Sequence, residues 1–84
     1  MRKVNQGWRD RTEDGEVREV MGVRDKQGWS IKSRLKGVEE WTPHPRPDRR
    51  DVEALIELLE LKYRRGKGAL KEVETAKKLL LKCR

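Results

Sequence analysis

The 84-residue chain is 44% charged and 33% hydrophobic, and its 22 basic and 15 acidic residues give a net charge of +7. This length allows one domain with a small core, which we expect residues 1–84 to form. No segment approaches the ~18 apolar residues of a membrane span, and the N-terminus lacks the apolar segment of a secretion signal. Cys83 is the only cysteine, which excludes an internal disulfide and a Cys-based zinc site. The composition therefore predicts a soluble, cytoplasmic protein.

The first half of the chain predicts an antiparallel sheet. Residues 1–7 are polar and basic, and we expect them to form a flexible tail. Four strand candidates follow within residues 8–42: a short one at 8–12, a Val-rich one at 16–24, a cleanly alternating one at 29–36 and a last short one at 39–42. Gly15 and Gly28 mark the turns between the first three. The pattern predicts a meander of three or four strands.

The second half predicts two helices behind a stiff connector. Prolines alternate with other residues over 43–47, which favours an extended segment. Asp48 is placed as the N-cap of a central helix over 48–65, and a short Gly-Lys-Gly connection leads to a second helix over 69–83. A connection this short makes the two helices antiparallel neighbours. The fold class is therefore α+β, with the sheet packed on a C-terminal helical hairpin.

The central helix carries two apolar stripes. One stripe contains Val52, Leu55, Ile56, Leu59 and Tyr63, and the adjacent one contains Ala54, Leu58 and Leu61. A helix with a single buried face needs only one stripe. We therefore expect the sheet to cover one side of this helix and the second helix to cover another. In the second helix, Leu70, Val73, Ala76 and Leu80 form the predicted buried stripe.

Alternation along the strands assigns side chains to two faces of the sheet. In the third strand, Trp29 and Ile31 predict the buried face, so the basic side chains between them point outward. In the second strand, we place the more apolar set, which begins at Val17, on the buried face. That choice also buries Glu19, which would then need a bulge near Gly22 or an edge position. The outer face gathers Arg9, Arg11, Arg18, Arg24, Lys32, Arg34 and Lys36.

A basic sheet face without interposed acids is suited to following a phosphate backbone. We therefore predict a non-enzymatic module that binds nucleic acid, with DNA favoured over RNA. Two alternatives stay open: an ordinary solvated face, and a protein-interaction or structural module that uses apolar residues of the second helix. A second basic cluster, Lys62, Arg64 and Arg65, either contacts phosphates or complements the dipole of the central helix. The order of sheet and helix over residues 16–65, with GWSIKSRLKGVEEW and the helix after it, resembles AP2-type and integrase arm-type DNA-binding domains. That resemblance implies a sheet face that enters the major groove.

Other residues are given less specific roles. The three tryptophans, Trp8, Trp29 and Trp41, are expected in the core rather than stacked on bases, and His44 is expected in an exposed loop. Leu79 and Leu81 lie off the stripe of the second helix, where they either cover the rim of the core or contact a partner protein or a second copy. The chain has no recognisable catalytic motif. We therefore expect no enzymatic activity, cofactor or metal.

Overall fold

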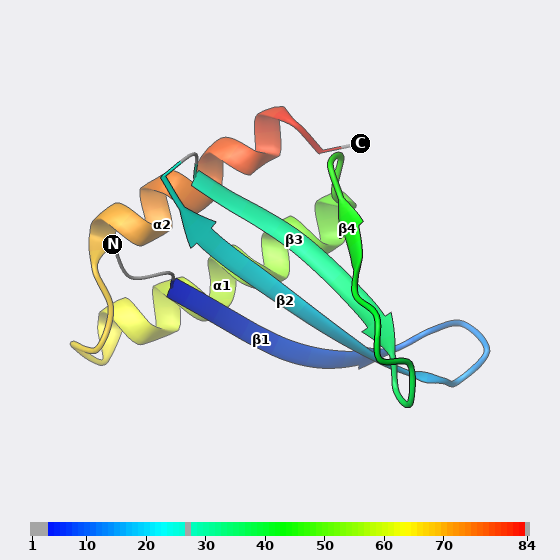
Figure 1. The fold of residues 1–84 in the computed structure, drawn as a ribbon. Helices are drawn as coiled ribbons and strands as arrows, with labels where there is room; N and C mark the ends of the chain where they lie inside the picture. Colours follow the sequence, from blue (N-terminus) through cyan, green and yellow to red (C-terminus); the bar gives the residue numbers. More distant parts are fainter. Residues whose placement is uncertain (1–3, 27, 84) are drawn as a thin grey trace.

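The structure is a computed structural model that describes residues 4–26 and 28–83. Its strands and helices, in chain order, are β1 (Val4–Arg11), β2 (Val17–Asp25), β3 (Gly28–Leu35), β4 (Thr42–His44), α1 (Arg49–Arg64), α2 (Leu70–Lys77) and the 3₁₀ helix η1 (Lys78–Leu81). The four strands pair antiparallel in the order β1-β2-β3-β4. Both α-helices lie on one face of the sheet, and within residues 4–26 and 28–83 no helix lies on the other face (Figure 1). The predicted α+β meander followed by a helical hairpin is confirmed.

The strands begin and end at other residues than predicted. β1 starts at Val4, so residues 4–7 belong to the sheet and not to a flexible tail, while residues 1–3 lie outside the described part. Asn5 pairs with Val23 and Gly7 with Met21, so the backbone of this segment is held by β2. The polar side chains of residues 4–7 give no sign of this pairing. β4 runs over Thr42–His44 and includes Pro43, which the prediction assigned to the connector. A proline is accepted there because β4 is an edge strand.

The start and the buried stripe of α1 follow the prediction. Asp48 is the N-cap, and its Oδ1 accepts a hydrogen bond of 3.2 Å from the backbone N of Arg50. Four of the predicted stripe residues are buried, namely Val52, Leu55, Ile56 and Leu59. The second stripe is only partly covered, and Leu61 at its end is exposed, as is Tyr63. No described helix covers the far side of α1 (Figure 1).

The second helix lies beside α1 and also packs on the sheet. The Trp29 side chain of β3 donates a hydrogen bond of 3.1 Å from Nε1 to the backbone oxygen of Glu72 in α2. Val73 and Ala76 share the core with Trp29. α2 packs onto α1 as predicted, and it also contacts β3, so both helices share one layer against the sheet (Figure 1).

Leu79 belongs to the core, in contrast to the predicted stripe of the second helix. The chain tightens into the 3₁₀ helix η1 at Lys78, where three residues make one turn. Leu79 therefore follows Ala76 on the buried side, while Leu80 is only half-buried. At the other end of this stripe, Leu70 is 47% exposed. Among the described helices, none is long and apolar enough to cross a lipid bilayer.

The predicted faces of β2 are reversed in the structure. Val20 is buried against the helices, and Gly22 lies so close to α1 that a Cβ on it would stand 2.9 Å from Leu55 Cδ1. The pairing with β1 runs without a bulge, so side chains alternate along the whole strand. Arg18 and Arg24 therefore face the helix layer, and Glu19 faces outward. The prediction put the more apolar set of β2 side chains on the buried face. It was wrong because α1 comes so close to this strand that a glycine is needed at position 22.

Candidate nucleic-acid interface

The outer sheet face is the side of the sheet turned away from α1 and α2 (Figure 1). Five of the seven arginines and lysines predicted for it lie there: Arg9, Arg11, Lys32 and Arg34 on the strands, and Lys36 just after β3, where its backbone N donates to the backbone oxygen of Val17. Its apolar residues, Val17, Met21 and Val23 of β2, are half-buried. The face is therefore both basic and partly apolar. That combination differs from the purely cationic surface that the sequence predicted.

Glu19 lies at the centre of the outer sheet face between two arginines. Its Oε1 accepts a hydrogen bond of 3.1 Å from Arg34 Nε, and its Oε2 lies 3.5 Å from Arg9 Nη2. Arg34 also donates a hydrogen bond of 3.2 Å from Nη1 to the backbone oxygen of Glu39. One acid thus holds two cations in place and leaves the cluster with positive charge. This carboxylate was assigned to the buried face in the sequence prediction, which was wrong.

Trp41 covers part of the same basic cluster. The guanidinium carbon of Arg34 lies 4.4 Å from the centre of its ring, and Lys32 Nζ lies 5.4 Å from it. Both distances are within the range of cation–π attraction. The prediction that all three tryptophans lie in the core is wrong for Trp41. Trp29 is buried in the core, and Trp8 packs partly against it. Trp41 lies in the segment just before β4, and its contacts with Lys32 and Arg34 of β3 hold it on the outer face.

A shallow hollow opens beside Trp41. It has a volume of about 290 Å³, and the residues that line it include Gly7, Arg9, Glu19, Met21, Arg34 and Trp41. Gly7 has no side chain opposite Met21, its partner across β1 and β2. The gap in side chains at this pair leaves room next to the indole ring. We call this feature the Trp41 hollow.

Acidic residues lie at both ends of the outer sheet face. The β1–β2 turn contains Glu13, Asp14 and Glu16, and the segment before β4 contains Glu39 and Glu40. Asp25 lies at the opposite end, where β2 meets β3. Arg9, Lys32 and Arg34 lie in the middle of the face, around the Trp41 hollow, whereas Arg11 and Lys36 lie at the end that carries the β1–β2 turn.

Arg18 is part of the fold and not of this surface. Its guanidinium donates hydrogen bonds of 2.7 and 2.9 Å to the carboxylate of Asp10 on β1, and of 2.6 and 3.2 Å to that of Asp51 on α1. The hydrogen bond to Asp10, followed by that to Asp51, raises the pKa of Arg18. The hydrogen bond from Arg18 is also the main cause that lowers the pKa of Asp10. Asp51 is buried, so this network ties two strands to the first turn of α1 beneath the sheet.

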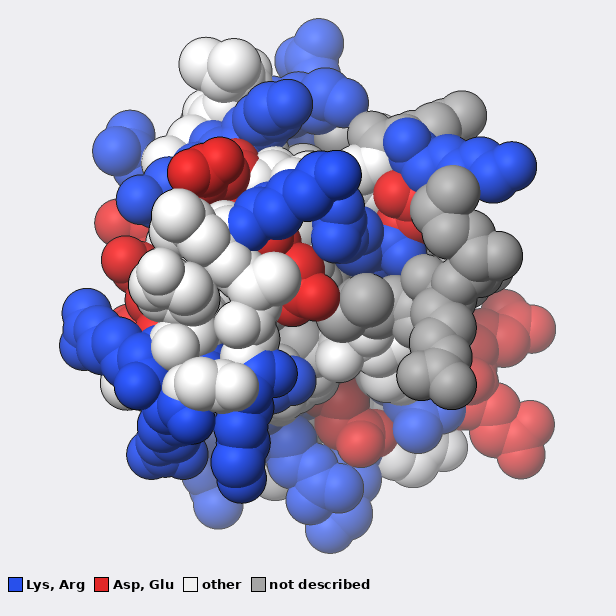
Figure 2. All heavy atoms as spheres, turned by 90° about the vertical axis from the view of Figure 1, so that its left-hand side faces the viewer, with Lys and Arg blue, Asp and Glu red and all other residues white. Residues whose placement is uncertain are grey.

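The second predicted cluster lies in the helix layer. Lys62, Arg64 and Arg65 are exposed at the C-terminal end of α1, as expected for cations at that end of the helix dipole. Figure 2 shows Lys and Arg side chains gathered on the lower part of the end of the molecule that carries the α1–α2 connection. This cluster and the outer sheet face point in different directions (Figure 1). A single short ligand would not cover both.

His44 is half-buried in β4, so its predicted place in an exposed loop is wrong. Its Nε2 lies 2.6 Å from the Oγ of Ser33, which is buried on β3. The two side chains fasten the edge strand to its neighbour. Ser33 is too deeply covered to meet a substrate. Within residues 4–26 and 28–83, no three His, Cys, Asp or Glu side chains gather as a metal ion would require.

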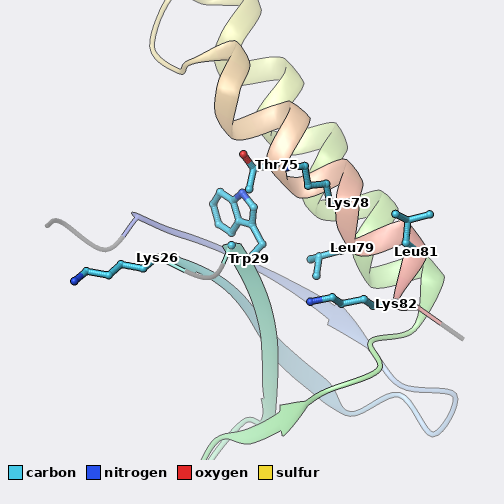
Figure 3. Close-up of a pocket in the computed structure, with 8 residues that line it drawn as sticks. Lys26, Trp29, Thr75, Lys78, Leu79, Leu81 and Lys82 are labelled. Atoms are coloured by element: carbon cyan, nitrogen blue, oxygen red, sulfur yellow. The ribbon is translucent and has the colours of Figure 1, made fainter.

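A second hollow lies between the β2–β3 turn and the end of the helices. It measures about 460 Å³ and is lined in part by Trp29, Leu79 and three lysines. In Figure 3, the Lys26 side chain extends away from Trp29, whereas the Lys82 side chain lies beside Leu79, so the lysines do not converge on one ligand position. Leu81 is 89% exposed, whereas Leu79 is a core residue. Of the two leucines predicted to contact a partner, only Leu81 is therefore accessible.

Comparisons of the chain with protein-family models, with curated protein sequences and with solved structures give no match. The resemblance to AP2-type and integrase arm-type domains thus concerns the order of the elements alone. The function has to be argued from the chemistry of the surface.

Proposed function

We propose that the protein is a non-enzymatic module that binds nucleic acid, with DNA as the first candidate, through the outer sheet face. The observation that carries this proposal is the arrangement of five arginines and lysines on one open face, around a central tryptophan. Glu19 in their midst is already paired with two of the cations, so it offsets only part of their charge. A cytoplasmic location, as the composition predicts, would give such a face access to nucleic acid.

The five basic residues would act in two ways. Arg9, Arg11 and Lys36 are exposed at β1 and at the end of β3, where they would meet phosphates directly. Lys32 and Arg34 lie against Trp41, which restricts their motion before a ligand arrives. Contacts of this kind fix the position of the backbone and carry no sequence information themselves. Binding would therefore be of moderate affinity and strongly dependent on salt.

A titration of labelled oligonucleotides, duplex and single-stranded, followed by fluorescence anisotropy tests this proposal. We expect a Kd below about 100 µM at about 50 mM salt, because non-specific binding alone reaches that range. If four phosphates are contacted, duplex affinity should fall about 100-fold between about 50 and 200 mM salt. Binding weaker than about 100 µM to both oligonucleotides at the lower salt would refute the proposal.

A matched pair of charge-reversal variants locates the surface. Lys32→Glu with Lys36→Glu changes the outer sheet face, and Lys62→Glu with Arg65→Glu makes the same change in net charge at the end of α1. We expect the sheet variant to bind at least about 10-fold more weakly than the helix variant, since only the sheet cations would contact phosphates. Equal losses would mean that total charge, and not this face, determines binding.

A further inference from the structure

We propose that the Trp41 hollow receives one unstacked base, which makes the outer sheet face a site for single-stranded nucleic acid. This inference rests on the proposed function and goes beyond it, because phosphate contacts alone do not distinguish one strand from two. It depends on three features of the hollow: a missing side chain at Gly7, an aromatic wall at Trp41 and charged groups at the rim.

The shape of the hollow comes from the pair of Gly7 and Met21. Met21 supplies an apolar, adaptable surface on β2, and Gly7 leaves the neighbouring position on β1 empty. A Cβ added to Gly7 would meet only the backbone oxygen of Val20, at 3.6 Å. Neither steric crowding nor a positive φ therefore requires glycine here, so the fold itself gives no reason for the empty space. At about 290 Å³, the hollow is close in size to the smaller ligand pockets of proteins.

The chemistry of the walls suits a base. The indole of Trp41 offers a flat ring, and stacking on aromatic side chains is the common way in which proteins hold unpaired bases. Arg34, against that ring, provides both a planar guanidinium and a positive charge for the adjoining phosphate. Glu19 lines the hollow, and its carboxylate, which already pairs with Arg34 and Arg9, keeps further lone pairs that can accept a hydrogen bond from a base edge. Arg9 on β1 lies opposite Glu19, and Lys32 on β3 lies opposite Met21.

A duplex cannot use the hollow without disruption. Its bases are stacked and paired, so a base would first have to leave the stack, at a cost of a few kcal/mol. A single strand presents its bases without that cost. The structure thus favours a strand that lies across β1, β2 and β3, with phosphates on the basic residues and one base beside Trp41.

Two variants test the inference against single-stranded oligothymidylate of about 12 nucleotides and a duplex of mixed sequence. Trp41→Ala removes the aromatic wall, and Gly7→Val fills the hollow without a change in charge. We expect each to weaken single-strand binding by about 5- to 100-fold, the range measured when a stacking aromatic is truncated. Duplex binding should stay within about twofold of the unmodified protein, since it relies on phosphate contacts.

Asn5→Val is the matched control for Gly7→Val. Asn5 is exposed on the same strand and face but lies outside the hollow, so its replacement should leave both affinities unchanged. Thermal melting followed by circular dichroism confirms that each variant is folded. If Trp41→Ala does not fold, Trp41→Phe replaces it, and a loss of the ligand-dependent change in tryptophan emission then reports on contact with the ring.

The possible outcomes separate this inference from the proposed function. A selective loss of single-strand binding in both variants supports it. Equal losses for duplex and single strand, or no loss for the single strand, overturn it while leaving the nucleic-acid proposal intact. If the unmodified protein binds neither oligonucleotide, the proposed function fails and this inference fails with it.

Discussion

Two arginines on adjacent strands show how the two faces of the sheet differ. Arg18 bridges Asp10 and Asp51 beneath α1, and the side chain of Asp51 is only 5% exposed. Arg34 pairs with Glu19 on the open face, where 29% of the arginine side chain and 22% of the glutamate side chain remain exposed. Exposed ion pairs contribute up to about 1 kcal/mol, whereas breaking a buried one costs several times more. An arginine–carboxylate contact therefore stabilises the fold where the buried Asp51 takes part, whereas the partly exposed contact on the other face remains available to a ligand.

Replacing these two arginines should give the largest difference in stability between the two faces. Arg18→Ala leaves Asp51 buried without its partner, so we expect the free energy of unfolding to fall by about 3–5 kcal/mol. Arg34→Ala should lower it by about 1 kcal/mol or less. Urea denaturation measures both. Arg18→Lys, which keeps the charge without the planar fork, should lie between them and serves if Arg18→Ala does not fold. A loss for Arg18→Ala no larger than that for Arg34→Ala would contradict the assignment of the network to the fold.

Two glycines on adjacent strands extend the comparison to packing. A Cβ at Gly22 would collide with Leu55, which is fully buried, whereas one at Gly7 meets only a backbone oxygen at an ordinary contact distance. We therefore expect Gly22→Val to lower the free energy of unfolding by about 1–3 kcal/mol through overpacking. Gly7→Val should change it by less than about 0.5 kcal/mol, as for most surface substitutions. Chemical denaturation of the two variants side by side tests this, and similar values for both would show that α1 does not approach the sheet at Gly22.

The same positions explain what could be predicted from the sequence. Alternation identified the strands, and the helix cap at Asp48 was read correctly because capping is a local signal. The faces of β2 could not be assigned locally. Gly22 is required by the distant Leu55, and Arg18 is tolerated on the buried face only because Asp10 and Asp51 meet it. The sequence carries one sign that the faces of β2 are the reverse of those predicted: the predicted buried face contained an acid, Glu19, that had no partner there.

The candidate site was predictable only in part, for a similar reason. Lys32, Arg34 and Lys36 followed from the alternation of one strand. The place of Trp41 depends on contacts with those cations across the β3–β4 connection, and no short-range pattern reveals such contacts. Gly7 fell in a segment predicted to be a tail, so the Trp41 hollow had no counterpart in the sequence.

The acid dependence of stability should show the smallest of these effects, and it concerns only the Arg18 network between the sheet and α1. Arg18 holds the pKa of Asp10 below its usual range, so the folded protein binds a proton there less readily than the unfolded chain, whose Asp pKa is about 3.9. The stabilising contribution of this carboxylate is complete above about pH 5 and is lost as the pH falls toward the lowered pKa. In urea denaturation from about pH 7 to pH 3, the advantage of the unmodified protein over Asp10→Asn should therefore be constant at first and shrink below about pH 4. A difference that stays the same or grows in acid would mean that Asp10 is not held ionised by Arg18. Because other carboxylates titrate in both proteins, only this difference isolates the network beneath the sheet.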